Sequence, residues 1–353
     1  MQWGNGEKRW PYKTWYVLIV LVWQLTDLGS YHSWSHRVSE YGIDEAIRIS
    51  RFENMHPRAM AEYAREYEID CDVEQLDTVD AYFDEGGFNR AKAAVQEILQ
   101  HIPELNYKIH TAEEAQENLR LAPTCVGAIT YAAGKLWPYK FVSQIIQLLV
   151  TKGVNIQTET PATGITRDGD KWRIITPRGS ILTQHIVHAT NGYTEYLLPE
   201  FHDLITPTRG HMTAQIPPTS LSVPPLEHTY SFIYSKGRFD YFIQQPEYDG
   251  CKLMLGGGYY EDPCPTSYED NTTSEEAQRY LRQQLPKVFK WKGEEDPEKR
   301  VYMKWSGIMG FSGDGLPWVG PLSEELGGKG QWVCAGYTGE GILLPFVANG
   351  QEW

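Results

Sequence analysis

The stretch WSGIMGFSGDGLPWVGP occupies residues 305–321, and WVCAGYTGEG follows at residues 332–341. Each stretch is an apolar run that ends in a turn rich in glycine. In a doubly wound sheet, such strand ends face the crevice where nucleotides bind, because only small residues let the backbone approach a phosphate or a ring closely. The two stretches therefore predict the closing half of a nucleotide-binding domain.

A third candidate loop is HATNGYTEYLLPE at residues 188–200, which follows a short apolar strand pattern. Taken alone, this loop is more typical of a plain β-turn. Together with the two later stretches it suggests a common site. If the three loops converge, their backbone N–H groups face one anionic or electron-rich ligand.

Length and composition limit the class of protein. A chain of 353 residues exceeds the usual size of one hydrophobic core, which predicts two domains. The net charge of −14, without a block of Lys or Arg, argues against a nucleic-acid partner or an anionic membrane partner. Small molecules are the expected partners.

The cysteines and the N-terminal segment bear on location. The five cysteines are scattered and form no CxxC pair, which argues against a disulfide framework or a metal site and favours a reducing compartment, the cytoplasm. The apolar segment WYVLIVLVW at 15–23 is too short to span a bilayer. We interpret it as a buried strand or an edge segment, with a signal anchor as the alternative.

Hydrophobic periodicity predicts the main elements. A helix is expected over 39–68, interrupted at Pro57, followed by a strand at 71–83 and a helix at 88–102. Pro138 opens another helix, which ends at Gly153 before a strand and forms half of a βαβ unit.

The second half of the chain is richer in strand patterns. Hairpin turns at RDGD and PRGS separate three short strands between 164 and 190. After Pro207 an antiparallel sheet is expected, interrupted by a helix over 273–289 with a capping box formed by Thr273 and Glu276.

Six segments together resemble one known family: HATNGYTEYLLP, PTRGHM, DYFIQQP, KLMLGGG, WSGIMGFSGDGLPWVGP and WVCAGYTGEG. They are similar to the FAD-dependent oxidoreductases of the D-amino-acid oxidase, glycine oxidase and sarcosine oxidase superfamily, and most similar to a fungal branch of it. The resemblance covers about residues 31–350. It implies FAD as cofactor and oxidation of the C–N bond of an amine or an amino-acid-like small molecule by hydride transfer to the flavin, with oxygen as the acceptor.

The resemblance also implies a mixed α/β fold. A Rossmann-like FAD-binding domain, incomplete at its N-terminus, is interleaved with an antiparallel-sheet substrate domain. The expected FAD-binding parts are 31–70, 136–206 and 300–353; the expected substrate or cap parts are 71–135 and 207–299; residues 1–30 form an atypical N-terminal segment.

Candidate site residues come from the loops and from the expected cover strand. The candidates for cofactor binding are Ala189, Thr190, Asn191, Gly192, Asp314, Gly315, Gly336, Tyr337, Thr338, Gly339 and Gly341. The candidates for the substrate side are Tyr241, Gln244, Arg238 and Met309. No catalytic acid or base is assigned, and His211 is interpreted as a structural hydrogen-bonding residue, with a catalytic base as the alternative.

The sequence departs from the family pattern in three places. It contains no GxGxxG loop after an opening strand, so either an opening βα unit is lost or the chain handles the FAD diphosphate differently. Glu340 replaces the histidine of the usual Gly-His-Gly. Met309 stands where the amino-acid-oxidising relatives hold an arginine, so either the substrate lacks an α-carboxylate or Arg238 or Arg209 replaces that arginine.

These departures leave two alternatives beside the enzyme. One is a truncated, non-catalytic remnant or accessory protein of the same fold, because a missing diphosphate loop removes several backbone donors. The other is an oxidative tailoring enzyme of secondary metabolism that acts on a secondary amine or a heterocycle.

Overall fold

The computed structural model describes residues 29–222, 224–235, 237–293 and 296–339. The segment 15–23, Glu340 and Gly341 lie outside these residues. The fold is mixed α/β, as predicted.

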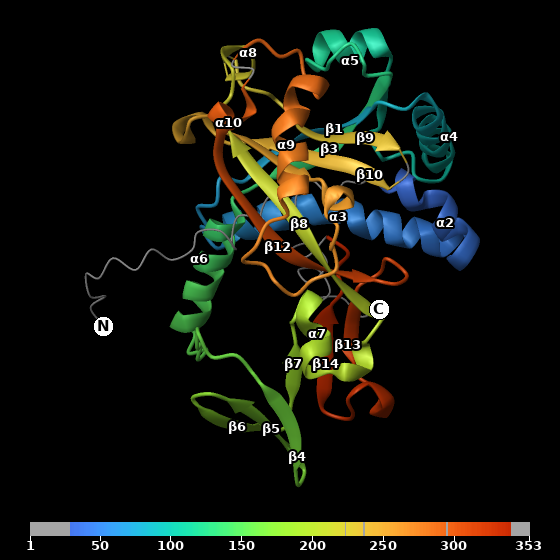
Figure 1. Cartoon of the computed structure of the whole chain (residues 1–353). Helices are drawn as coiled ribbons and strands as arrows, with labels where there is room; N and C mark the ends of the chain where they lie inside the picture. The colour runs from blue at the N-terminus through green and yellow to red at the C-terminus, as the bar shows by residue number, and fades with distance from the viewer. Residues whose placement is uncertain (1–28, 223, 236, 294–295, 340–353) are drawn as a thin grey trace.

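The main feature is a sheet of eight strands in the order β12-β8-β11-β10-β9-β1-β3-β2 (Figure 1). Its strands are β1 (Glu74–Tyr82), β2 (Lys108–His110), β3 (Gly127–Lys135), β8 (Ile205–Gln215), β9 (Thr229–Ser235), β10 (Arg238–Gln244), β11 (Leu253–Gly257) and β12 (Val301–Ser312). All neighbours in this sheet are antiparallel except β1 and β9. The expected antiparallel sheet after Pro207 is therefore present.

Helices cover both faces of this sheet. The α-helices are α2 (Tyr31–Tyr41), α3 (Ile43–Glu66), α4 (Glu85–His101), α5 (Ala112–Asn118), α6 (Pro138–Thr151), α7 (Thr194–Leu197), α8 (Thr219–Ser222), α9 (Glu275–Val288) and α10 (Pro297–Arg300). Figure 1 shows α9 in front of the strands and α3 behind β8 and β12. Leu281 and Leu285 of α9 pack on Phe242 and Leu255, whereas α2 and α4 pack on the opposite face beside Tyr82 and Ile129.

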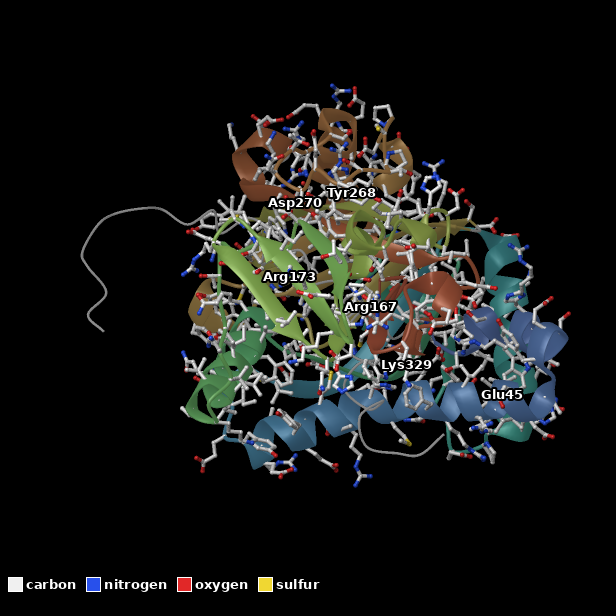
Figure 2. The ribbon with its side chains drawn as sticks, turned by 90° about the horizontal axis from the view of Figure 1, so that it is seen from below. Glu45, Arg167, Arg173, Tyr268, Asp270 and Lys329 are labelled. Carbon is white, nitrogen blue, oxygen red and sulfur yellow. The ribbon has the colours of Figure 1, made fainter. Side chains whose placement is uncertain are left out.

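Two three-stranded sheets lie apart from the large one. The first is the antiparallel meander β4 (Gly164–Asp168), β5 (Lys171–Thr176) and β6 (Gly179–Thr183), which confirms the predicted hairpins. The second joins β7 (Ile186–His188), β13 (Trp318–Pro321) and β14 (Gln331–Ala335), with β14 parallel to β7. The carbonyl of Lys329 accepts hydrogen bonds from Arg167 (3.3 Å) and Trp172 (3.2 Å), so the meander is attached to the loop before β14 (Figure 2).

Short 3-10 helices complete the described chain. They are η1 (Asn191–Tyr193), η2 (Pro199–Phe201), η3 (Glu247–Asp249), η4 (Tyr259–Glu261) and η5 (Glu324–Leu326). Of the helices in the described ranges, none has the length and apolar character that a membrane crossing requires.

The predicted break at Pro57 is wrong, because α3 continues through this residue. Pro57 cannot donate to the carbonyl of Glu53, its normal partner in a helix. The side-chain Nδ1 of His56 contacts that carbonyl at 3.0 Å instead. The helix is interrupted at Gly42, whose φ of 81° is a left-handed conformation that glycine adopts without strain.

Two further predictions need correction. The cap of α9 is Ser274 and not Thr273, because the Ser274 hydroxyl accepts from the N–H of Ala277. No strand directly follows Gly153, and β3 before α6 belongs to the large sheet, so α6 is not the helix of a βαβ unit.

The placement of two segments differs from the expected division of the chain. The sequence predicts that residues 300–353 belong to the FAD-binding part. In the structure β12 pairs along its length with β8 and so belongs to the large sheet. α2 packs against α4 of the large-sheet region. The sequence pattern of a helix or strand shows which of its faces is apolar, but not which sheet the strand joins or which element the helix packs against. The remainder of the domain division stays a prediction.

A buried carboxylate, Asp240 on β10, ties the large sheet to α9. Its Oδ2 accepts from Tyr234 (3.0 Å) and from Tyr280 of α9 (2.8 Å). Its Oδ1 accepts from Tyr260 and from the N–H of Gly258, both at 3.1 Å. Burial raises the pKa of Asp240 to about 6 and outweighs these hydrogen bonds, which favour the charged form.

Replacing Asp240 by asparagine is expected to change how stability depends on pH. A carboxyl whose pKa is raised on folding contributes stability while protonated, and this contribution is lost as the pH rises from about 4 through about 6. The amide of the variant stays neutral throughout. The free energy of unfolding of D240N relative to the native chain, measured in urea at about pH 4 and about pH 7, should rise by up to about 3 kcal/mol. An unchanged difference between the two pH values would contradict the raised pKa.

Candidate functional site

The three loops predicted from the sequence converge in the structure. Asn191, after β7, places its side-chain Oδ1 within 3.1 Å of the N–H of Gly336 and 3.3 Å of the N–H of Tyr337, both after β14. The N–H of Thr338 donates to the carbonyl of Gly310 on β12 at 2.7 Å. We call residues 189–192, 310–315 and 336–339 the loop junction. It connects the large sheet to the β7–β14 sheet.

The conformation of Asn191 explains why this residue type stands there. Its φ of 44° is left-handed, which Asn tolerates better than most side chains. From this conformation the amide oxygen satisfies two backbone donors of the neighbouring loop. Asn191 therefore acts within the loop junction as a structural clamp.

Two glycines of the loop junction serve packing between the loops. A Cβ on Gly192 would lie 3.0 Å from the carbonyl oxygen of Met309, and a Cβ on Gly310 would lie 2.8 Å from the nitrogen of Gly192. Any side chain at either position would push the loops apart. The small residues that suggested close approach to a ligand are here needed, in part, for close approach of two backbones.

The turn at 313–315 is open to solvent. Gly313, Asp314 and Gly315 are exposed, and a Cβ on either glycine would meet nothing within 4 Å. The Asp314 carboxylate accepts from the N–H of Leu316 at 3.0 Å, so this side chain shapes the turn. The backbone here is accessible to a flat ligand.

The remaining cofactor candidates lie at the same junction. Ala189 is exposed, and the Thr190 hydroxyl is 3.0 Å from the Thr194 hydroxyl. Gly339 has a φ of 94°, and Gly341 lies outside the described residues. The structure brings these residues together; whether they contact a cofactor remains a prediction.

The residues present fit one end of FAD. Open glycine backbone beside a rigid, hydrogen-bonded junction suits the edge of a flavin ring, which needs backbone donors and close approach. For the diphosphate, the usual holder is a glycine loop at a helix N-terminus. No helix within residues 29–339 begins with such a GxGxxG loop. The junction therefore fits the ring end of FAD.

An apolar cluster, which we call the methionine face, lies on the side of the large sheet opposite α9. It consists of Met212, Ala214, Tyr241, Met254 and Trp305, with Trp137, Phe239, Ile243, Met303 and Met309 packed against it. A Cβ on Gly256 would fall on the ring of Tyr241 and on the sulfur of Met212, so both side chains fold over this glycine. The side chain of Met309 packs against this face, and its carbonyl lies against Gly192 of the loop junction.

Tyr241 has an unusual hydroxyl. The residue is 3% exposed, and its Oη has no hydrogen-bond partner among the described residues. Burial raises the pKa of this hydroxyl well above its ordinary value, so it stays protonated. A buried hydroxyl without a partner costs about 1–3 kcal/mol. It is a candidate for contact with a ligand.

Two substrate-side candidates lie elsewhere. Gln244 donates to the carbonyls of Leu221 (2.8 Å) and Cys251 (3.1 Å) and accepts from Leu226, so it fastens the segment before β9 on the side opposite Tyr241. Arg238 is exposed and pairs with Glu261 at 2.8 Å. Neither side chain contacts Tyr241. Gln244 is three residues from Tyr241 on β10 and therefore points to the opposite face. Arg238 lies at the start of the strand.

Arg209 is also engaged. Its guanidinium binds Asp262 through Nε at 3.0 Å and through NH2 at 2.9 Å, and its NH1 donates to Thr272. His211 contacts the same carboxylate at 2.8 Å and is fully buried, and burial lowers its pKa. This geometry supports the structural interpretation of His211. No local sequence signal points to Asp262, because only folding brings it next to His211, 51 positions away in the sequence.

Comparison with known proteins identifies the family. A model of the FAD dependent oxidoreductase family, DAO, matches residues 27–348. Among solved structures, glycine oxidase from Geobacillus kaustophilus is 19% identical, with a TM-score of 0.67 over 84% of this chain and 75% of that chain. L-proline dehydrogenase from P. horikoshii is 18% identical, with a TM-score of 0.64 over 83% and 74%.

A third similar structure is NikD, described as an unusual amino acid oxidase essential for nikkomycin biosynthesis. It is 11% identical, with a TM-score of 0.65 over 87% of this chain and 77% of that chain. At these identities the structural likeness shows the fold. Because the family model spans nearly the whole sequence, the chain belongs to the DAO family of FAD-dependent oxidoreductases.

Proposed function

We propose that this chain oxidises the C–N bond of a small amine. The substrate would lose a hydride from carbon and a proton from nitrogen and become an imine. Dioxygen would take up the two electrons and two protons and become hydrogen peroxide. Bound FAD supplies the hydride acceptor. The residues of the chain have to orient the donor carbon and exclude water.

The observation that carries this proposal is the position of Met309. Its side chain packs against the methionine face from the edge strand β12, and its carbonyl lies against Gly192 of the loop junction. A substrate on the methionine face would therefore lie next to a ring held at the junction. The apolar side chains exclude water, and the unpartnered Tyr241 hydroxyl offers the substrate one hydrogen bond.

The same position supports a substrate without an α-carboxylate. Met309 offers no cation, Arg238 is paired with Glu261, and Arg209 is paired with Asp262. A carboxylate on the methionine face would be buried without a charged partner, which is costly. A secondary amine or a heterocycle without a carboxylate avoids this cost. An oxidative tailoring enzyme that acts on such a substrate is therefore the second candidate function.

The thiols bear on the location of the protein. Cys71, Cys125, Cys251, Cys264 and Cys334 are all free. Free thiols persist in a reducing compartment, which supports a cytoplasmic location.

An absorption spectrum of the purified full chain tests the proposal. We expect added FAD to bind and show the two visible bands of oxidised flavin, and a secondary amine to bleach them under anaerobic conditions. A folded protein that stays colourless after gel filtration with FAD would overturn the proposal. It would favour the non-catalytic remnant instead.

Replacing Asn191 by Ala should weaken the loop junction. The change leaves the N–H groups of Gly336 and Tyr337 without their acceptor and should cost about 1–3 kcal/mol in unfolding free energy. FAD affinity, measured by flavin fluorescence, should fall about tenfold, since 1.4 kcal/mol is tenfold. The control is N191D, which keeps the acceptor and tolerates the left-handed conformation. Native affinity in N191A would contradict the clamp role.

Replacing Tyr241 by Phe should lower turnover of the amine without lowering the stability of the fold. Removing a hydroxyl without a partner should leave the free energy of unfolding unchanged or raise it by about 1 kcal/mol, while kcat/KM for the amine falls.

The matched control for Tyr241 is Tyr230, also buried but on the α9 side, whose hydroxyl donates to the carbonyl of Leu119 at 3.2 Å. Y230F should lose about 1 kcal/mol of stability and keep its turnover. If Y241F turned over the amine like the native chain, the Tyr241 hydroxyl would have no role in the site.

A further inference from the structure

A second buried carboxylate, Asp80 on β1, lies outside the site described above. It is 0% exposed. Three groups contact its Oδ2: the hydroxyls of Tyr31 (2.6 Å) and Tyr131 (3.1 Å) and Nε2 of His32 (2.9 Å). Its Oδ1 is buried and has no partner in the described part of the chain. All three groups thus contact one oxygen, and the other stays buried without a partner in the described part of the chain.

The charge around Asp80 is also incomplete. Burial, followed by the negative charge of Asp80, raises the pKa of Tyr31 and of Tyr82 well above the ordinary value, so both remain neutral donors. Of the three groups that contact Oδ2, only His32 can carry a positive charge. Burying a carboxylate is costly unless it is paired and hydrogen-bonded. An additional N–H donor with a positive charge at Oδ1 would complete the site.

Asp240 shows that an unpartnered oxygen is not a general property of buried carboxylates in this protein. Asp240 is equally buried and also surrounded by tyrosines, but both of its oxygens accept hydrogen bonds. It points toward α9, whereas Asp80 contacts Tyr31 of α2 on the other face of the sheet. The two residues form a natural matched pair.

The register of the sheet places Asp80 in line with Tyr241. Asp80 pairs with Ser231 on β9, and Ser231 pairs with Tyr241 on β10. Side chains directly opposite each other on neighbouring strands share a face. Adjacent strands are about 4.8 Å apart, so the backbones at Asp80 and Tyr241 are about 10 Å apart. Two buried polar groups without full partners therefore share one row on the face opposite α9.

One side of the site lies near the surface. The side chain of His32 is 23% exposed while it contacts Asp80. The rings of Tyr31 and His32 stack with centroids 4.2 Å apart. Aromatic faces beside a carboxylate favour an organic cation over a hydrated metal ion.

We propose that Asp80 binds a protonated amino group of the substrate, with Oδ1 accepting from the ammonium and the tyrosine rings forming the walls. This inference rests on the proposed function, in which the reacting C–N bond lies near Tyr241. An amino group held at Asp80 is a strand pair away from Tyr241 and is not the reacting one. The substrate class is therefore a diamine, or a longer amine with a second cationic nitrogen.

Binding of cadaverine and of pentylamine to the full chain tests this inference. The two ligands have the same carbon chain, but only cadaverine carries a second ammonium. By calorimetry near neutral pH, the native chain should bind cadaverine at least about tenfold more tightly than pentylamine, as a charge-assisted hydrogen bond in a buried site provides. D80N should lose this preference, and D240N should keep it. Equal affinities in the native chain, or an unchanged preference in D80N, would overturn the inference.

A second pair of variants covers the case in which D80N does not fold. H32K places an ammonium next to Asp80 from a partly exposed position and should abolish the preference for cadaverine, whereas H32Q should retain it. A preference that survives in H32K would also overturn the inference. Because binding is measured without turnover, failure here is distinguishable from failure of the proposed function, which the flavin spectrum reports separately.

Discussion

The side-chain oxygen of Asn191 and the backbone around it hold together the two main parts of the described structure. This oxygen, just after β7, accepts from the N–H groups of Gly336 and Tyr337, just after β14. The N–H of Thr338 then donates to the carbonyl of Gly310 and so joins this segment to β12. β12 in turn pairs with β8 in the large sheet. The candidate cofactor loops and the candidate substrate face are thus fixed relative to each other by a few hydrogen bonds.

The two faces of the large sheet have different tasks. The face under α9 is packed mainly with apolar side chains, and both oxygens of its buried carboxylate, Asp240, accept hydrogen bonds. The opposite face carries the methionine face and, in the same row, two polar groups that lack a partner among the described residues, Tyr241 and Asp80. Buried polar groups are normally satisfied. Since Gln215 Oε1 and Gln278 Oε1 on the α9 side also lack a partner among the described residues, the argument for a ligand rests on Tyr241 and Asp80 lying in one row. The ion pair of Arg209 with Asp262 belongs to the supporting structure, which removes Arg209 as a partner for a substrate carboxylate.

Much of the fold was predictable from local patterns. The alternation around RDGD and PRGS gave the meander, and Pro138 gave the start of α6, because these signals act within a few residues. Predictions failed where the outcome depends on a side-chain hydrogen bond that the sequence pattern does not reveal. Helix α3 continues through Pro57 because the side chain of His56 contacts the carbonyl of Glu53 that Pro57 leaves without a donor. Gln244 does not lie on the substrate side with Tyr241, because its amide is hydrogen-bonded to Leu221, Leu226 and Cys251. Asp80 could have been noticed as a charge between Val79 and Ala81, but its unpartnered oxygen is evident only once Tyr31, His32 and Tyr131 surround the carboxylate.

The sequence by itself determined the family and the small-residue loops, because glycine turns after apolar runs are local and leave few conformational alternatives. Through the resemblance, it also predicts that Met309 stands where the amino-acid-oxidising relatives hold an arginine. Only the tertiary structure decided that the loops meet through Asn191, that Arg209 and Arg238 are occupied, and that Asp80 lies in line with Tyr241. The physical reason is that hydrogen bonds and ion pairs between distant segments depend on strand register and burial, which no local stretch of sequence specifies.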